Sequence, residues 1–142
     1  MKTIKKLVCL WAFLAVANTS QAQTKEETIT WLKEKILNYK IMPNPIEISK
    51  IDECEVVIIG YSMHDKNKIV YRMSFPTNPT GVDGSSLMFN SKVVETAKGG
   101  SKYYGIEAIG IVDFQREQDL AGRFLKAINH LHTFCPINQE TF

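Results

Sequence analysis

Apolar and polar positions along the chain follow a helical spacing near both ends and a strand-like spacing between them. From Thr24 to Tyr39, apolar residues recur every three or four positions, as on the buried face of a helix. The residues of this face are Ile29, Leu32, Ile36 and Tyr39. Thr24 and Glu27 have the spacing of a capping box, and Pro43 ends the pattern. We therefore expect a helix over residues 24–39.

Alternating or continuous apolar runs between residues 46 and 112 predict strands. These runs are IEIS (46–49), CEVVIIGYS (54–62), IVYRMSF (69–75), SLMFNSKVVETA (86–97) and YYGIEAIGIV (103–112). The almost unbroken apolar run over 56–59 predicts a central strand or one buried on both faces. Short polar turns between the runs favour antiparallel pairing. The segment Pro76–Gly84 contains two prolines and two glycines, and we expect it to be a loop.

A second helical pattern closes the chain and predicts a helix from about Gln115 to Phe134. Its apolar face comprises Leu120, Phe124, Ala127, Ile128, Leu131 and Cys135. Asp113 is the expected N-cap, and Pro136 stops the helix. Helices at the two ends of a run of antiparallel strands indicate an α+β fold. We expect an N-terminal helix, a strongly curved antiparallel sheet of five to seven strands, and a C-terminal helix that caps the core.

Both helices carry sequence motifs of a known group of proteins. The opening helix contains TITWL (Thr28–Leu32), and the closing helix contains RFLKAINHL (Arg123–Leu131). With strands between these motifs, the chain resembles small secreted bacterial proteins that have a pleckstrin-homology-like (PH-like) fold. The resemblance implies the curved, helix-capped sheet described above, and it implies no activity.

The residues before the first helix have the pattern of a secretory signal peptide. Three lysines within the first six residues precede an apolar run over 7–17, and Ser20 and Ala22 supply the small residues of a cleavage site. A membrane-spanning helix needs about 20 apolar residues, and this run has only 11. We predict cleavage after Ala22, a secreted or periplasmic product, and no membrane insertion of that product.

Removal of residues 1–22 changes the sign of the net charge. The whole chain has 17 basic and 15 acidic residues. The leader contains three lysines and no acidic residue, so 14 basic and 15 acidic residues remain, a net charge of −1. A basic surface that would bind nucleic acid is therefore not expected. Residues 23–142 have the length of a single domain with its own core.

Two cysteines remain after cleavage, Cys54 and Cys135. An even number of cysteines in an oxidising compartment is consistent with a disulfide, which would join the early strands to the end of the last helix. Two buried free thiols are the alternative, because cysteine is also a common core residue. The spacing along the chain does not decide between the two.

No residue pattern indicates a catalytic, metal or cofactor site. His130 and His132 are two positions apart on a predicted helix and therefore face different directions, and His64 lies in a separate turn. Ser85 follows a glycine turn but lacks the G-x-S-x-G pattern of a nucleophile. The glycines of KGGSK (98–102) precede a strand rather than a helix, so they predict a hairpin turn and not a phosphate loop. We expect no enzymatic activity, no metal and no cofactor.

Surface recognition is the function that these observations leave open. The candidate binding residues are Trp31, Tyr103, Tyr104, Pro76, Asn78 and Asp83. They are aromatic residues and loop positions, which are enriched at binding surfaces. The structural alternative is that Trp31 packs against a neighbouring strand and the loop merely connects two strands. We predict a small non-catalytic binding domain for an unidentified protein or small ligand. A small secreted hydrolase or a protein that sequesters a small ligand is the alternative, and either would need a concave site.

Overall fold

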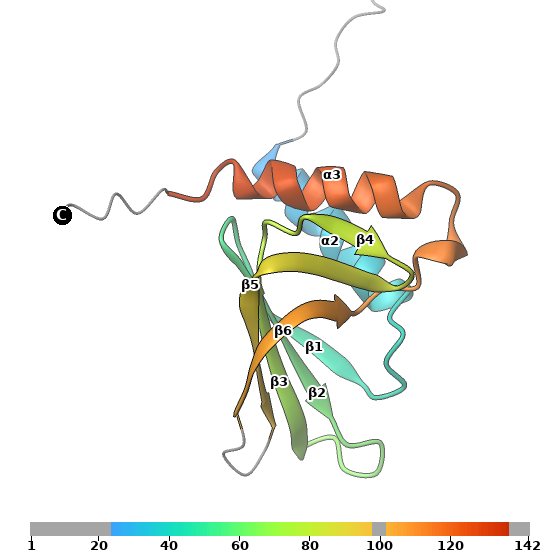
Figure 1. The fold of residues 1–142 in the computed structure, drawn as a ribbon. Coiled ribbons are helices and arrows are strands. Elements are labelled where there is room, and N and C mark those ends of the chain that lie inside the picture. The colour runs from blue at the N-terminus through green and yellow to red at the C-terminus, as the bar shows by residue number, and fades with distance from the viewer. Residues whose placement is uncertain (1–23, 98–101, 137–142) are drawn as a thin grey trace, which may run out of the picture.

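The computed structural model describes residues 24–97 and 102–136 (Figure 1). In chain order the elements are α2 (Lys25–Asn38), β1 (Ile46–Ile51), β2 (Glu55–Tyr61), β3 (Ile69–Pro76), β4 (Gly81–Asp83), β5 (Ser86–Ala97), β6 (Lys102–Gly110), the short 3₁₀ helix η1 (Phe114–Arg116) and α3 (Leu120–His132). All strand pairs are antiparallel. The expected α+β class is confirmed. The predicted signal peptide lies outside the described residues.

The strands form two small three-stranded antiparallel groups. One group is β1, β2 and β3, and the other is β4, β5 and β6. The groups are joined where residues 71–74 of β3 pair with residues 94–97 of β5. The first part of β5 pairs with β4 instead, and its register with β6 shifts between Met88 and Val93. The expectation of one strongly curved sheet was therefore wrong, because β5 changes its partner along its length.

Part of the predicted loop over 76–84 is a strand. Residues Gly81–Asp83 form β4, which pairs with the start of β5. Gly84 has a φ of +56°, in the left-handed region that glycine adopts without steric cost, and there the chain reverses into β5. The prolines and glycines thus mark a connection followed by a tight hairpin, rather than one long loop.

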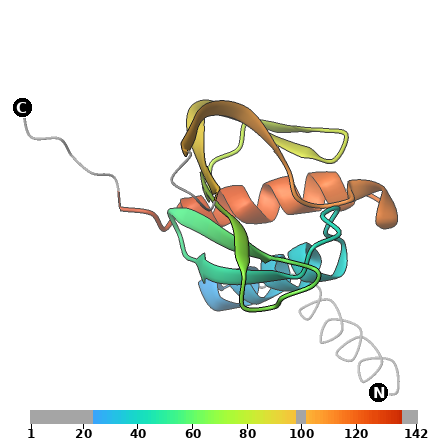
Figure 2. The same cartoon turned by 90° about the horizontal axis from the view of Figure 1, so that it is seen from below.

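The helices α2 and α3 lie side by side across one end of the strands (Figures 1 and 2). Burial of their apolar faces supplies the main stabilising term of such a fold. Most of the largest fully buried side chains come from both helices and from β2 and β3; they include Leu32, Ile36, Phe124, Ile128, Leu131, Val56, Ile58 and Phe75. The predicted apolar faces of the two helices are confirmed at these positions. The predicted central strand is also confirmed, because β2 lies between β1 and β3.

The closing helix begins later than expected. Instead of one helix from Gln115, the structure has η1 and then a separate α3. Asp113 caps η1, because its side chain accepts a 3.2 Å hydrogen bond from the backbone amide of Gln115. Glu117 has an extended backbone and Asp119 has a φ of +55°, so the chain cannot continue as one helix through these positions. The predicted start of this helix was therefore wrong.

Candidate functional site

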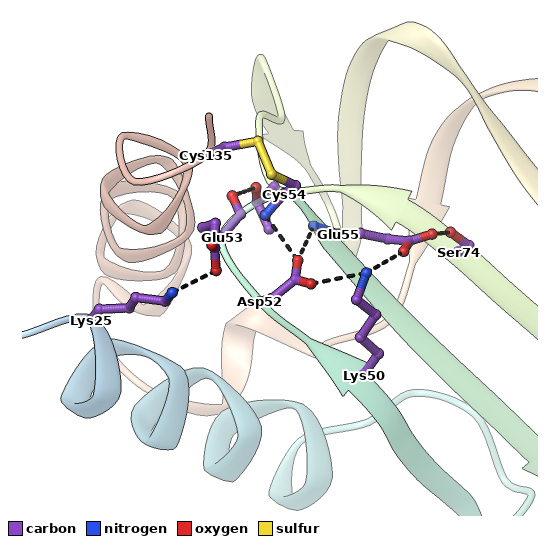
Figure 3. A network of polar contacts seen from close by, with 9 residues as sticks. Lys25, Lys50, Asp52, Glu53, Cys54, Glu55, Ser74 and Cys135 are labelled. Carbon is purple, nitrogen blue, oxygen red and sulfur yellow. Dashed lines mark hydrogen bonds and ion pairs between the residues drawn. A yellow bond between two sulfur atoms is a disulfide. The ribbon is translucent and has the colours of Figure 1, made fainter. Parts of the chain in front are cut away.

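A disulfide between Cys54 and Cys135 ties the end of α3 to the turn between β1 and β2 (Figure 3). The two Cα atoms are 5.0 Å apart, and 81 positions separate the residues in the chain. The structure thus selects the disulfide from the two predicted alternatives. Closure of so long a loop restricts the unfolded chain, which corresponds to about 4 kcal/mol in the chain-entropy model.

Beside the disulfide, the buried hydroxyl of Thr77 lies between Glu53 and His132. Thr77 Oγ1 donates to the carbonyl oxygen of Glu53 and lies 3.0 Å from His132 Nδ1. The Thr77 hydroxyl has a single proton, and it donates that proton to the carbonyl oxygen of Glu53. In the contact between Thr77 and His132, the hydrogen is therefore on His132 Nδ1. A histidine that donates to a hydroxyl group cannot remove its proton, so this pair lacks the polarity of a nucleophile and its base. Together with the disulfide, these hydrogen bonds hold the turn between β1 and β2 against the end of α3.

The turn between β1 and β2 is held by a network of charged and polar groups (Figure 3). Asp52 accepts hydrogen bonds from the backbone amides of Cys54 and Glu55, at 3.0 and 2.9 Å. Lys50 Nζ lies 2.9 Å from Asp52 and 3.0 Å from Glu55, which also accepts a hydrogen bond from Ser74. Burial raises the pKa of Asp52, but the bonds from Lys50 and the two amides outweigh it and lower that pKa. Because both carboxylates already have partners, we interpret this network as structural.

Trp31 of α2 packs against α3. Its ring centroid is 6.2 Å from that of Phe124 in α3. Lys35 Nζ lies 5.7 Å and the guanidinium carbon of Arg123 lies 5.5 Å from the Trp31 ring centroid, within the range of cation–π contacts. Glu117 forms ion pairs with both cations, at 2.7 Å from Lys35 Nζ. The hydrogen bonds from Lys35 and Arg123 lower the pKa of Glu117.

An open groove of about 430 Å³ lies beside Trp31 on α2. It is lined by Glu26, Glu27, Thr30, Trp31 and Glu34. The carboxylate of Glu27 is oriented by the capping box, because it accepts a 2.9 Å hydrogen bond from the backbone amide of Thr24. The hydroxyl of Thr30 donates its proton to the carbonyl oxygen of Glu26 at 2.9 Å. The polar side chains around Trp31 therefore offer hydrogen-bond acceptors and negative charge beside an apolar ring.

The predicted binding residues of segment 76–84 do not line this groove. Pro76 ends β3, Asn78 is exposed in the connection to β4, and Asp83 is exposed at the end of β4. The connection is fixed to α3, since the side-chain amide of Asn129 donates to the carbonyl oxygen of Pro79 at 3.3 Å. This segment therefore packs on α3, away from the groove beside Trp31.

The predicted tyrosines lie on β6. The backbone of Tyr103 pairs with Glu95 of β5, and Tyr104 follows it in the same strand. Their side chains lie outside the part of the structure that is described. The suggestion that these tyrosines form a binding surface stays a prediction.

A second open groove, of about 520 Å³, lies where β1 begins, β2 ends and β3 begins. It is lined by Pro45, Ile46, Glu47, Tyr61, Lys66, Asn67 and Ile69. The Tyr61 hydroxyl donates a 2.6 Å hydrogen bond to Glu47, which raises the pKa of Tyr61. No motif in the sequence predicts this groove. Its only local signal is the polar turn after Tyr61, and the approach of that turn to residues 45–47 depends on the strand register.

The histidines do not converge. His132 contacts Thr77, and the ring centroid of His130 is 5.2 Å from that of Phe134. Over residues 24–97 and 102–136, no group of three or more His, Cys, Asp or Glu side chains is arranged to hold a metal ion. None of the helices in this part of the chain is long and apolar enough to span a membrane.

Comparison with known proteins yields no relative for this chain. No family model, no curated protein and no solved structure matches it.

Proposed function

We propose that the chain is a small exported binding module, without catalytic activity, that captures a positively charged segment of a partner in the groove beside Trp31. The proposal takes the processed chain, residues 23–142, as a single domain in a secreted or periplasmic location. It also retains, as a proposal, the resemblance to small secreted bacterial proteins with a PH-like fold.

The observation that carries this proposal is the chemistry of the groove lining. Glu26, Glu27 and Glu34 place three carboxylates around the exposed edge of an aromatic residue. A lysine or arginine side chain fits this arrangement, because its methylene stem can cover apolar surface while its charged end donates to carboxylates. Glu26 and Glu27 also stabilise the first turn of α2 through the helix dipole. Glu34 lies beyond the range of that effect, and its exposed carboxylate lies 3.9 Å from Lys35 Nζ, a long ion pair.

The residues around the groove are held in position before any partner binds. Trp31 is held from α3 by Arg123 and Phe124, and the start of α2 is fixed by its capping box. Lys25, in the first turn of α2, also forms a 2.7 Å ion pair with Glu53 in the turn that carries the disulfide. A rigid site loses less conformational entropy on binding, so these contacts support recognition by a small surface.

A small hydrolase has less support in this geometry. The Thr77–His132 contact has the wrong hydrogen-bond polarity for nucleophile activation, and the Thr77 side chain is fully buried. A substrate would have to reach a hydroxyl that is enclosed by the β1–β2 turn and α3. The groove beside Trp31 needs no such rearrangement.

The test uses a short fluorescent peptide in which arginine and leucine alternate, and its binding to residues 23–142 is measured by anisotropy at low ionic strength. The matched peptide carries glutamine in place of arginine. We expect the double variant Glu26→Gln/Glu34→Gln to weaken binding about threefold to tenfold, because each exposed ion pair contributes about 0.2–1 kcal/mol. The variant Asp83→Asn/Glu107→Gln changes the net charge equally at exposed positions outside the groove and should bind as the parent does. Equal binding of the glutamine peptide, or equal loss in both double variants, would overturn the proposal.

A further inference from the structure

The second groove lies on a part of the molecule separate from the Trp31 groove. It is built by the start of β1, the end of β2 and the connection from β2 to β3, and that connection lies at the end of the strands away from the helices (Figure 1). No residue of this groove belongs to α2 or α3. A ligand bound here would therefore not compete with one bound beside Trp31.

Hydrogen bonds to backbone carbonyl groups fix the walls of this groove. The amide of Tyr61 donates to the Pro45 carbonyl oxygen at 2.9 Å, and the Asn44 side chain donates to the Tyr61 carbonyl oxygen at 2.9 Å. In the connection, the amide of Ser62 donates to the carbonyl oxygen of Lys68 at 2.8 Å. The two walls thus have a defined geometry before a ligand arrives, which lowers the entropic cost of binding.

The lining of the groove combines two opposite charges with apolar side chains. Glu47 provides a carboxylate that is already oriented by the hydroxyl of Tyr61. Lys66 provides an ammonium group that forms no ion pair with any residue in the described part of the chain. Of the apolar lining residues, Ile46 is partly buried and Ile69 is 39% exposed. Apolar surface with a few oriented polar groups is typical of small-molecule sites.

We propose that this groove binds a small zwitterion with an aliphatic side chain, of the amino acid class. The ligand's ammonium group pairs with Glu47, its carboxylate pairs with Lys66, and its side chain covers Ile46 and Ile69. The inference does not depend on the proposed function, because it uses none of the residues of the Trp31 groove.

Addition of a partner strand to the edge of β1 explains the same surface less well. Among the described strands, β1 pairs only with β2, so its other edge is a candidate for such pairing. However, Pro45 precedes the strand, and the register is irregular between Ile48 and Lys50. Proline and bulges are the features by which edge strands avoid pairing with other chains. Only Ile46–Ile48 would be available, too short a segment for stable strand addition.

The test is a nuclear magnetic resonance titration of residues 23–142 with L-leucine. The matched probes are 3-methylbutylamine, which lacks the carboxylate, and 4-methylpentanoate, which lacks the ammonium group. We expect saturable shifts of the amides of Ile46, Tyr61 and Asn67, with leucine bound at least about fivefold more tightly than either analogue, as expected for one exposed ion pair of about 1 kcal/mol. The variants Lys66→Met and Glu47→Gln should each weaken leucine binding by a similar factor.

Lys68→Met is the control, since Lys68 is exposed in the same connection but does not line the groove. It should leave leucine binding unchanged. The inference is overturned if leucine binds no more tightly than the analogues, if Lys68→Met has the effect of Lys66→Met, or if no saturable shift occurs. Binding of the arginine–leucine peptide to the variants Lys66→Met and Glu47→Gln is measured separately. A failure of the leucine test can therefore be distinguished from a failure of the proposed function.

Discussion

Arg123 of α3 stacks on Trp31 of α2, with its guanidinium carbon 5.5 Å from the centroid of the indole ring. The same guanidinium forms an ion pair with Glu117, which also binds Lys35. Arg123 of α3 therefore contacts both Trp31 of α2 and Glu117 in the connection before α3. Trp31 also lines the proposed binding groove. Removal of Arg123 should affect both stability and the environment of Trp31.

We expect Arg123→Gln to lower the free energy of unfolding by about 0.5–1 kcal/mol, the usual contribution of an exposed cation–π contact. The measurement is equilibrium urea denaturation of residues 23–142. Arg116→Gln is the matched control, because Arg116 is more exposed and its ion pair with Asp113 lies on the surface. If the two variants lose the same stability, the stacking on Trp31 has no special role.

The disulfide predicts a large dependence of stability on reducing agent. Reduction of Cys54–Cys135, or the double variant Cys54→Ser/Cys135→Ser, should lower the free energy of unfolding by about 4 kcal/mol. Urea denaturation with and without dithiothreitol provides the measurement. The double serine variant should be insensitive to dithiothreitol, and a parent chain that is equally insensitive would contradict the disulfide.

Gly60 is predicted to be intolerant of a side chain. A Cβ atom at this position would lie 2.1 Å from Cζ of Tyr71, whose ring covers the glycine. The Tyr71 hydroxyl is held by a 2.7 Å contact with the sulfur of Met42, which limits movement of the ring. We expect Gly60→Ala to destabilise the fold by about 1–3 kcal/mol. Gly81→Ala is the control, since no atom lies within 4 Å of a Cβ there, and thermal denaturation of both variants should separate them.

Stability should fall in acid. The carboxyl groups with lowered pKa values are Asp52, Glu53, Glu55 and Glu117. Their ordinary values are 3.8 for Asp and 4.5 for Glu. A pKa that is lower in the folded state stabilises the fold above the ordinary value, and this stabilisation is lost as the pH falls through the folded value. We expect little change from pH 7 to about 5 and a steep loss below about 4, measured by urea denaturation.

Asp52→Asn provides the control for this pH dependence. It removes the carboxyl group that accepts two backbone amides and Lys50, so the loss of stability in acid should become shallower. If the loss of stability at low pH is the same in this variant as in the parent, Asp52 does not contribute to that loss. Lys25, Lys35 and Lys50 have raised pKa values, so their contribution has the opposite sign and is lost only above the ordinary value of 10.5.

Local sequence patterns were sufficient for the elements whose causes are local. The capping box of Thr24 and Glu27 and the burial of Leu32 and Ile36 follow from spacing within α2. The break before α3 could not be predicted in this way. Glu117 leaves the helical conformation where it binds Lys35 and Arg123, and the first of these contacts joins residues that are distant in the chain.

The site was predictable only in part for the same reason. Trp31 was predicted to be a binding residue because aromatic residues are enriched at binding surfaces, but its contacts with two cations depend on how α3 docks on α2. The groove at Glu47 and Lys66 depends on the register of β1 and β2, which places two separate polar segments side by side. Neither arrangement leaves a signal in a single stretch of sequence.

The most direct test of the binding proposal is the fluorescence of Trp31 during titration with the arginine–leucine peptide. The chain has two tryptophans, and residues 23–142 contain only Trp31. The proposal predicts a saturable change in its emission at the peptide concentrations at which anisotropy reports binding, shifted to higher concentrations by Glu26→Gln/Glu34→Gln. Binding of the peptide with no change in Trp31 emission would contradict the assignment of this groove.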